Sequence, residues 1–186
     1  MHAYLEKLLQ GAPVEWKTLG EVAKLQRGTS ITKKKIIHGD IPVIAGGQNP
    51  AYYHSEHNRD GETIVVAGSG AYAGFVSYWN VPIFVSDAFS IKTDAEKLLP
   101  KYLFYFLKNM QEQIHGMKKG SGVPHVYISD VQKIKIPIPP IEEQKRIAGI
   151  LDKFHTLAHS LSEGLPKEIA LRQKQYEYYR EQLLSF

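Results

Sequence analysis

The sequence predicts an α+β fold, in which a strand-rich domain over residues 1–140 is followed by a helical region over residues 141–186. Between residues 18 and 110 the chain consists mostly of short stretches rich in β-branched and aromatic residues, separated by Gly, Asn and Pro. From residue 141 onward the apolar residues instead recur at three- and four-residue steps, which is the period of a helix.

Four strand-like stretches lie in the first domain, at residues 41–47, 62–68, 74–79 and 82–91. Before them, "TLGEVA" predicts a short helix, because Thr18 and Glu21 have the spacing of a capping box.

After these strands the apolar period changes. Residues 100–116 show helical spacing, with Pro100 suited to the first turn. The residues Ile134, Ile136 and Ile138 alternate with Lys and Pro, which predicts a strand with one solvent-facing side.

The C-terminal region carries two helical patterns separated by "EGLP". The apolar residues of the first step by three and four, as in a coiled-coil seam, and are Ile147, Ile150, Phe154, Leu157 and Leu161. Those of the second form one stripe that includes Ile169, Tyr176, Tyr179 and Leu183. On this pattern alone, a hairpin folded onto its own domain and an interface with another chain remain equal alternatives.

Composition limits the function classes. The 186 residues contain no Cys, which excludes a disulfide framework and a cysteine nucleophile and fits a reducing, cytoplasmic setting. No apolar run reaches 18 residues, so no membrane span is expected. Residues 1–140 hold 16 Lys and Arg against 12 Asp and Glu, whereas residues 141–186 hold seven of each. This distribution favours an anionic partner for the first domain.

The motifs that suggest catalysis or metal binding are weak. The glycines in "AGSGAYAGF" lack the following helix of a dinucleotide-binding loop, so a hairpin is expected there. The sequence "NPAY" at 49–52 approaches the motif of amino-methyltransferases but lacks their alternating β/α pattern. The His pairs 54/57 and 155/159 have no third ligand. We therefore expect no bound cofactor or metal and a binding protein, not an enzyme.

Basic and polar loops are the candidate binding sites. Lysine ammonium groups hold phosphates, amide, hydroxyl and imidazole groups read base edges, and Gly lets a backbone approach closely. The loop residues of these types are Lys33, Lys34, Lys35, Gln48, Asn49, Lys118, Lys119, Ser121, Gly122 and His125. Taken singly, each loop is better interpreted as a solvated turn.

Three blocks of sequence resemble the specificity subunit of type I DNA restriction–modification systems. They are "VEWKTLGEVAKLQRG" (14–28), "GSGVPHVYISDVQKIKIPIPPIEEQKRIAGILDKF" (120–154) and "IALRQKQYEYYREQLLSF" (169–186). The resemblance covers nearly the whole chain in the family's order. Family members usually carry two such units in tandem, whereas this chain shows one, so it resembles a half-length form.

The resemblance implies roles for these regions. Residues 1–140 would be a target-recognition domain that binds double-stranded DNA, with the five loop lysines on phosphates and Gln48, Asn49, Tyr72, Ser121 and His125 at or near the bases. Residues 141–186 would form an antiparallel, coiled-coil-like dimer element. A methylation subunit, which binds S-adenosylmethionine, and a restriction subunit would be the partners. Two copies would then read inverted half-sites.

Two other interpretations remain open. The chain could be a small DNA methyltransferase that uses "NPAY" itself, or an assembly protein that occupies methylation subunits without reading DNA. Binding of S-adenosylmethionine by the isolated chain would favour the first alternative. Co-purification with a methylation subunit in the absence of any DNA sequence preference would favour the second.

Overall fold

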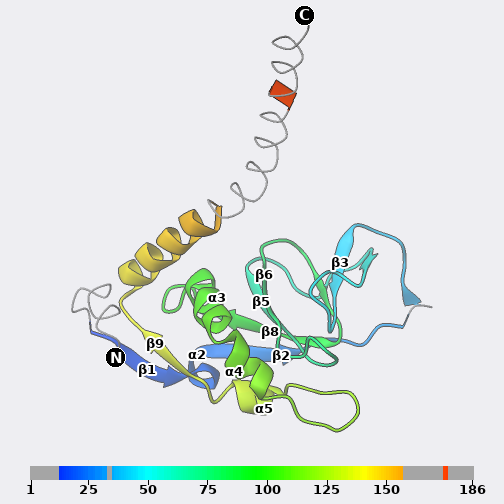
Figure 1. Cartoon of the computed structure of the whole chain (residues 1–186), viewed down its shortest axis with the longest axis horizontal. Coiled ribbons are helices and arrows are strands. Elements are labelled where there is room, and N and C mark those ends of the chain that lie inside the picture. The colour runs from blue at the N-terminus through cyan, green and yellow to red at the C-terminus, as the bar shows by residue number, and fades with distance from the viewer. Residues whose placement is uncertain (1–12, 33–34, 157–173, 176–186) are drawn as a thin grey trace, which may run out of the picture. The chain divides into compact units, whose positions relative to one another are not determined.

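The computed structural model describes residues 13–32, 35–156 and 174–175 (Figure 1). The chain divides into two units, Met1–Ala148 and Gly149–Phe186. The first unit combines three sheets with short helices, which confirms the predicted α+β class.

The strands of the first unit are β1 (Glu15–Thr18), β2 (Ala23–Arg27), β3 (Ile41–Ile44), β4 (Tyr52–His54), β5 (Thr63–Ala67), β6 (Val76–Trp79), β7 (Phe84–Val85), β8 (Ala88–Thr93) and β9 (Lys135–Ile138). Its labelled helices are α2 (Leu19–Val22), α3 (Pro100–Asn109), α4 (Gln111–Gly116) and α5 (Ile128–Val131). A further helix covers residues 141–156.

A four-stranded sheet in the order β2-β8-β5-β6 forms the centre of the unit. All of its strand pairs are antiparallel. Strand β5 is buried along its whole length, and its side chains alternate between two apolar clusters. Ile64 and Val66 belong to the larger cluster and Val65 to the smaller one, as the two-residue period of a strand requires. The sheet therefore has a packed layer on each face.

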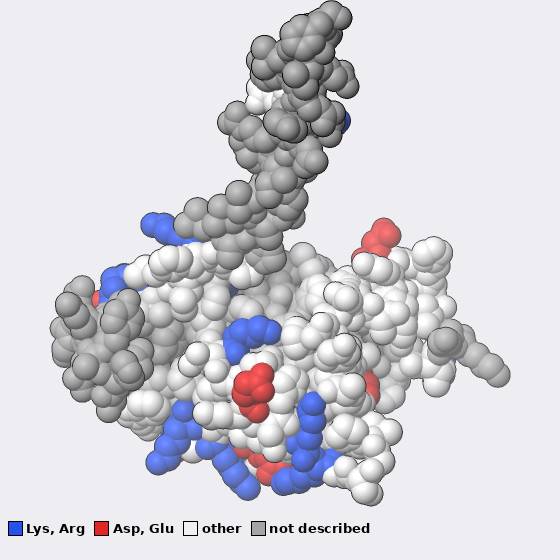
Figure 2. All heavy atoms as spheres, in the orientation of Figure 1, with Lys and Arg blue, Asp and Glu red and all other residues white. Residues whose placement is uncertain are grey.

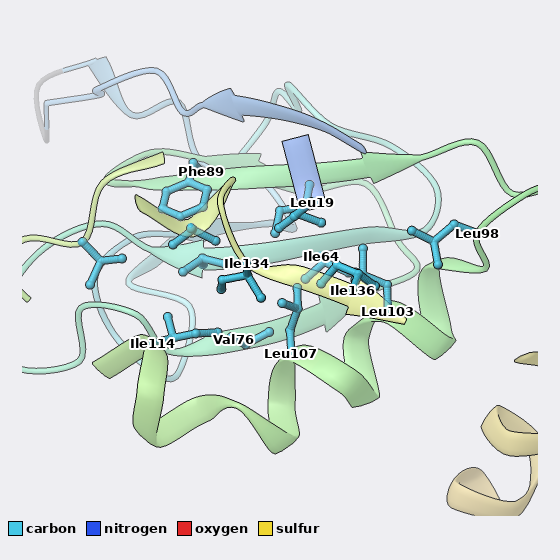
Figure 3. Packing of buried hydrophobic residues seen from close by; sticks show 14 of the residues in the cluster. Leu19, Ile64, Val76, Phe89, Leu98, Leu103, Leu107, Ile114, Ile134 and Ile136 are labelled. Carbon is cyan, nitrogen blue, oxygen red and sulfur yellow. The ribbon is translucent and has the colours of Figure 1, made fainter. Parts of the chain in front are cut away.

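The larger cluster lies between this sheet and the helices (Figure 3). Figure 3 shows Leu103, Leu107 and Ile114 of α3 and α4 pointing toward Ile64 and Val76 of the sheet. The labelled members of the cluster also include Leu19, Phe89, Leu98, Ile134 and Ile136. The helical period expected over 100–116 is confirmed, but Met110 interrupts it and separates α3 from α4.

The other face of the sheet packs against a three-stranded sheet in the order β4-β3-β7 through Ile44, Ile83 and Val85. The prediction of a single strand over residues 82–91 is wrong. Strand β7 pairs with β3 in one sheet, and β8 joins the other sheet after Ser86 and Asp87. The apolar pattern runs through both strands because both are buried, so it could not reveal the turn between them.

The predicted short helix and the alternating strand are both present. Helix α2 follows Thr18, whose backbone N–H and hydroxyl both donate to a carboxylate oxygen of Glu21 at 2.6 Å. The hydrogen bond from the Thr18 hydroxyl is the main cause that lowers the pKa of Glu21. Strand β9 pairs antiparallel with β1, so the segment before the helix at 141–156 is tied to the start of the described chain.

No helix among the described residues is long and apolar enough to cross a membrane.

Candidate nucleic-acid interface

The sheet topology gathers five connecting segments at one end of the first unit. Strands β2 and β5 both end where the antiparallel β8 begins. Strands β3 and β7 are parallel and end together, directly before the turn that leads into β8. We call these segments the loop end, and they are residues 27–30, 45–49, 68–74, 86–87 and 118–127.

Hydrogen bonds fasten the 118–127 segment to the 68–74 segment. The backbone N–H of Gly70 donates to the Pro124 carbonyl at 2.9 Å, and that of Val126 donates to the Gly68 carbonyl at 3.0 Å. Ser69 forms a β-bridge with His125, which is also bridged to Lys119. The basic loop is thus a small hairpin whose base rests on the end of β5.

Gly28 and Gly46 allow two further pairs of loop-end segments to approach each other closely. A Cβ atom at Gly46 would stand 2.6 Å from the carbonyl oxygen of Ser69, and one at Gly28 would stand 2.1 Å from that of Ser86. Any side chain at these positions would collide with backbone. The segment that holds Gln48 and Asn49 is therefore packed against the segment that holds Tyr72.

Most of the predicted contact residues are exposed at this end. Gln48, Asn49, Ser121 and Gly122 are exposed, and Tyr72 retains 47% of its accessible surface. Sequence reasoning placed these residues in separate loops, and the fold brings their loops to one surface. Figure 2 shows Lys and Arg side chains gathered along the lower edge of the view, where Figure 1 places α5 and the 118–127 segment.

The two lysines of the basic loop have intramolecular partners. The ammonium group of Lys118 donates to the Ala71 carbonyl at 2.8 Å, and that of Lys119 lies 2.7 Å from a carboxylate oxygen of Asp130. The Lys119 side chain nevertheless retains 61% of its accessible surface. The His125 ring contacts the Val123 carbonyl at 2.7 Å. Exposed pairs of this kind are weak, so these cations can exchange a partner for a phosphate.

The lysine cluster near residue 34 is only partly described. Lys33 and Lys34 lie outside the described residues. Lys35 is exposed, and its backbone N–H donates to the Thr32 carbonyl at 2.8 Å. Within the described residues, no hydrogen bond or ion pair joins Lys35 to the other predicted contacts.

A hollow of about 120 Å³ opens among the segments of the loop end. Its polar lining residues are Arg27, Ser30, Ser86, Asp87, His125 and Tyr127. Of these, sequence reasoning selected only His125. For Ser86 and Asp87 a signal was available, because a Ser-Asp dipeptide after an apolar strand is typical of a turn at a strand end.

Arg59 holds the backbone of Arg27, one of the residues that line this hollow. Its guanidinium group donates to the Arg27 carbonyl at 2.9 Å and to the Ser90 hydroxyl at 2.7 Å. Burial lowers the pKa of Arg59. The end of β2 is therefore held in place by a cation that is itself anchored in the sheet.

The motifs considered for catalysis lie in connections between antiparallel strands. The stretch "AGSGAYAGF" belongs to the antiparallel hairpin of β5 and β6, which confirms the expected hairpin. The "NPAY" sequence lies at the connection between β3 and β4, which pair antiparallel, and not between a strand and a helix. Among residues 13–32, 35–156 and 174–175, no group of three or more His, Asp or Glu side chains could hold a metal ion.

A second polar site lies away from the loop end, at the start of the helix over 141–156. The Gln144 side chain is fully buried and makes three hydrogen bonds of 2.9 Å. It accepts from the backbone N–H of Leu99 and donates to the carbonyls of Lys97 and Pro139. We call Gln144 and these three partners the helix joint, because they hold the start of the helix within the first unit.

The predicted interface residues begin on this helix. Ile147 packs against the main core, whereas Ile150 retains 37% and Phe154 retains 65% of the accessible surface. The other predicted interface residues lie outside the described residues and are Leu157, Leu161, Ile169, Tyr176, Tyr179 and Leu183.

Comparison with known proteins decides the family. Residues 13–171 match the family described as the type I restriction modification DNA specificity domain. The chain belongs to this family. The match spans both the strand-rich unit with its loop end and the helix joint, which confirms the resemblance drawn from the three sequence blocks.

Relatives of this specificity-domain chain carry consistent names. It is 35% identical to the specificity subunit of the type I restriction enzyme EcoR124I/EcoR124II of Escherichia coli, over 98% of this chain and 52% of that one. It is 31% identical to the specificity subunit of the type I restriction enzyme MpnII of Mycoplasma pneumoniae, over 96% of this chain and 56% of that one. The chain thus spans about half the length of these relatives.

Solved structures agree on the fold of this specificity domain. The S subunit of a type I restriction–modification system from M. genitalium superposes with a TM-score of 0.73 at 24% identity, over 91% of this chain and 46% of that one. The HsdS subunit from Thermoanaerobacter tengcongensis superposes with a TM-score of 0.63 at 20% identity.

Proposed function

We propose that this chain recognises a DNA sequence for a type I restriction–modification system and reads it with the loop end. The carrying observation is that five segments, separated by up to 100 residues in sequence, converge at one end of a rigid sheet and expose polar and cationic side chains there. Residues on connections held by a rigid scaffold are the usual location of binding sites. Membership of the specificity-domain family supplies the type of partner.

Within this proposal the lysines and the polar residues have different roles. Lys33, Lys34, Lys35, Lys118 and Lys119 would bind phosphates and hold the domain on the duplex. Gln48, Asn49, Tyr72, Ser121 and His125 would lie at or near base edges, with Gly122 allowing the backbone close to the groove. Phosphate contacts position a protein, whereas base contacts specify the sequence.

The chain would act by directing another protein and would have no catalytic role of its own. S-adenosylmethionine would be bound by a partner methylation subunit, and a restriction subunit could join that complex. The names of the relatives support this assignment, since they are specificity subunits of restriction enzymes.

Two copies would associate through the helices at residues 141–186 and form an antiparallel, coiled-coil-like element. Support comes from the exposed apolar side chains Ile150, Leu151 and Phe154 on the helix over 141–156. A homodimer would read two identical half-sites in inverted orientation. The second predicted helix, of about 20 residues, spans roughly 30 Å, close to one turn of B-DNA.

Mapping methylated adenines tests this function. The chain is expressed with a methylation subunit in cells that lack other adenine methylation, and the modified positions are sequenced. The expected result is a bipartite motif with inverted, identical halves, which disappears when the chain is omitted. Methylation that is absent, or that has no sequence motif, would contradict the proposal and favour the assembly-protein alternative.

Binding of S-adenosylmethionine by the isolated chain tests the remaining alternative, in which the chain is a small DNA methyltransferase. We expect no binding in calorimetry at ligand concentrations that saturate a methylation subunit. Binding together with methylation by the isolated chain would instead establish the small-methyltransferase interpretation.

A further inference from the structure

Asp87 is an acidic residue that lines the hollow of the loop end, and it lies in the turn between β7 and β8. Its side chain is exposed, and one carboxylate oxygen accepts a hydrogen bond from the Ser69 hydroxyl. Among the described residues, the carboxylate has no ion pair and no backbone N–H partner. The other carboxylate oxygen is therefore available to a ligand in the hollow.

The backbone that carries Asp87 is fixed from three sides. The Val85 and Ala88 carbonyls accept hydrogen bonds from the N–H groups of Thr29 and Gly28 at 2.9 and 2.8 Å. The Asp87 carbonyl accepts from Gly68 at 3.1 Å, on the side of β5. Ser86 in turn donates to the Ile44 carbonyl of β3 at 2.8 Å. Such a short turn between two buried strands presents its side chain with the precision that recognition of a ligand requires.

A carboxylate is unfavourable at most positions of a surface that binds DNA. DNA presents a dense row of negative phosphates, so a carboxylate facing the phosphodiester backbone is repelled. The base edges in the major groove do offer hydrogen-bond donors, which are the amino groups of cytosine and adenine. A carboxylate without an intramolecular cation is thus compatible with DNA where it meets one of these amino groups.

Cytosine fits a carboxylate better than adenine does. An ionised carboxylate only accepts hydrogen bonds. Adenine presents the acceptor N7 beside its amino group, and thymine presents the acceptor O4, so each of these bases turns a lone pair toward the carboxylate. Cytosine presents its N4 amino group without a neighbouring acceptor on the same base.

We propose that Asp87 is a specificity-determining residue that accepts a hydrogen bond from the N4 amino group of a cytosine in the major groove, with the Ser69 hydroxyl orienting its carboxylate. The inference rests on the proposed function and adds to it one base of the target. It also assigns Ser69 as a positioning residue, since it holds one carboxylate oxygen and leaves the other directed at the base.

Selection from randomised duplex DNA with the full-length chain tests this inference. Asp87→Asn keeps the shape of the side chain and an acceptor for Ser69, but it replaces one oxygen with an N–H donor that suits the O4 atom of thymine. Glu96→Gln is the matched control, because it removes the same charge from an exposed residue beyond the other end of β8. The six residues of β8 place that site roughly 20 Å away.

The expected result is a conserved C·G pair at one position of the half-site for the wild type and for Glu96→Gln. Asp87→Asn should lose about tenfold or more of the preference for cytosine over thymine at this position and keep the preferences at the others. Ser69→Ala, which retains the carboxylate, should give a smaller loss at the same position. Circular dichroism melts confirm that each variant is folded.

Four results would overturn the inference. A wild-type pattern with no C·G position refutes the role of Asp87, and so does a pattern that is the same in Asp87→Asn as in the wild type. Both outcomes leave the proposed function intact. A loss of preference at every position in folded Asp87→Asn would mean that Asp87 acts through the shape of the loops and contacts no single base. Absence of any enriched sequence with the wild type would refute both the inference and the proposed function.

Discussion

The helix joint and the loop end use similar polar groups in opposite ways. At the helix joint, Gln144 is fully buried, and its side chain is engaged in three hydrogen bonds to backbone. At the loop end, polar side chains such as Gln48 and Asp87 are exposed and retain unused hydrogen-bonding capacity. Buried polar groups must be satisfied within the fold, whereas exposed ones can be completed by a partner.

The two regions therefore place different demands on the sequence. The block "IPIPPIEEQKRI" contains the joint residues Pro139 and Gln144, where few side chains could meet the same three backbone groups. At the loop end, an exposed side chain such as that of Gln48 has no such requirement, although the backbone around it is closely packed. On the proposed function, the exposed side chains of the loop end would read the DNA sequence.

The largest expected effect comes from breaking the helix joint. Gln144→Leu should lower the free energy of unfolding by about 2–4 kcal/mol, because it leaves the N–H of Leu99 and two carbonyl groups without partners. Urea denaturation measures the loss. Gln113→Leu is the matched control at an exposed position and should change stability by less than about 0.5 kcal/mol. Equal effects of the two substitutions would show that the joint contributes little.

The second prediction concerns the helix beyond the joint. Phe154→Asp should weaken self-association by about 30-fold or more, since an aromatic anchor of an interface contributes about 2–4 kcal/mol. Folding of the first unit should be unchanged, because Phe154 retains 65% of its accessible surface. Sedimentation equilibrium gives the dissociation constant, with Lys153→Asp as the control one position away. A chain that is monomeric at micromolar concentration, with or without DNA, would refute the dimer itself.

The third prediction sharpens the role of the loop end. Replacing Lys118 and Lys119 with Ala should weaken binding to all DNA sequences and reduce the salt slope by about 0.9 for each lost phosphate contact, or about 1.8 in total. Titrations over a range of salt concentrations measure the slope. Lys97→Ala, at the far end of β8, should leave it unchanged. An unaltered slope in the double variant would remove both lysines from the interface.

The smallest effect is expected from Tyr102, which lies near the helix joint and donates to the Pro137 carbonyl at 2.9 Å. Burial raises the pKa of Tyr102 to about 12, above the value near 10 expected for the unfolded chain. Its stabilisation is therefore complete below pH 10 and is lost as the pH rises through about 12. Tyr102→Phe should cost about 1 kcal/mol at neutral pH and flatten this alkaline loss. Equally steep alkaline unfolding in both proteins would contradict the assignment.

The sequence predicted the elements of the fold better than their arrangement. A strand was predicted from the alternation of Ile134, Ile136 and Ile138, and a short helix from the spacing of Thr18 and Glu21. Both patterns reflect local geometry, which depends on neighbouring residues alone. The division of residues 82–91 between two sheets depends on distant strands, and its local signal was limited to the turn-forming dipeptide Ser86-Asp87.

The candidate site was likewise predictable from the sequence only in part. Lysine and glycine content identified the basic loops, but their convergence results from the antiparallel pairing of β8 with β2 and β5. Asp87 and Ser69 were missed because a single Asp or Ser in a turn is common, and only the tertiary structure places both beside His125.

The ratio of specific to non-specific DNA affinity tests the central claim most directly. The chain is titrated at one salt concentration with two duplexes. One carries the motif identified by mapping methylated adenines, and the other has the same composition in scrambled order. We expect the duplex with the motif to bind about 10³-fold more tightly or better, in the range of specific DNA-binding proteins. Equal affinity for the two duplexes would contradict the claim that the loop end reads sequence.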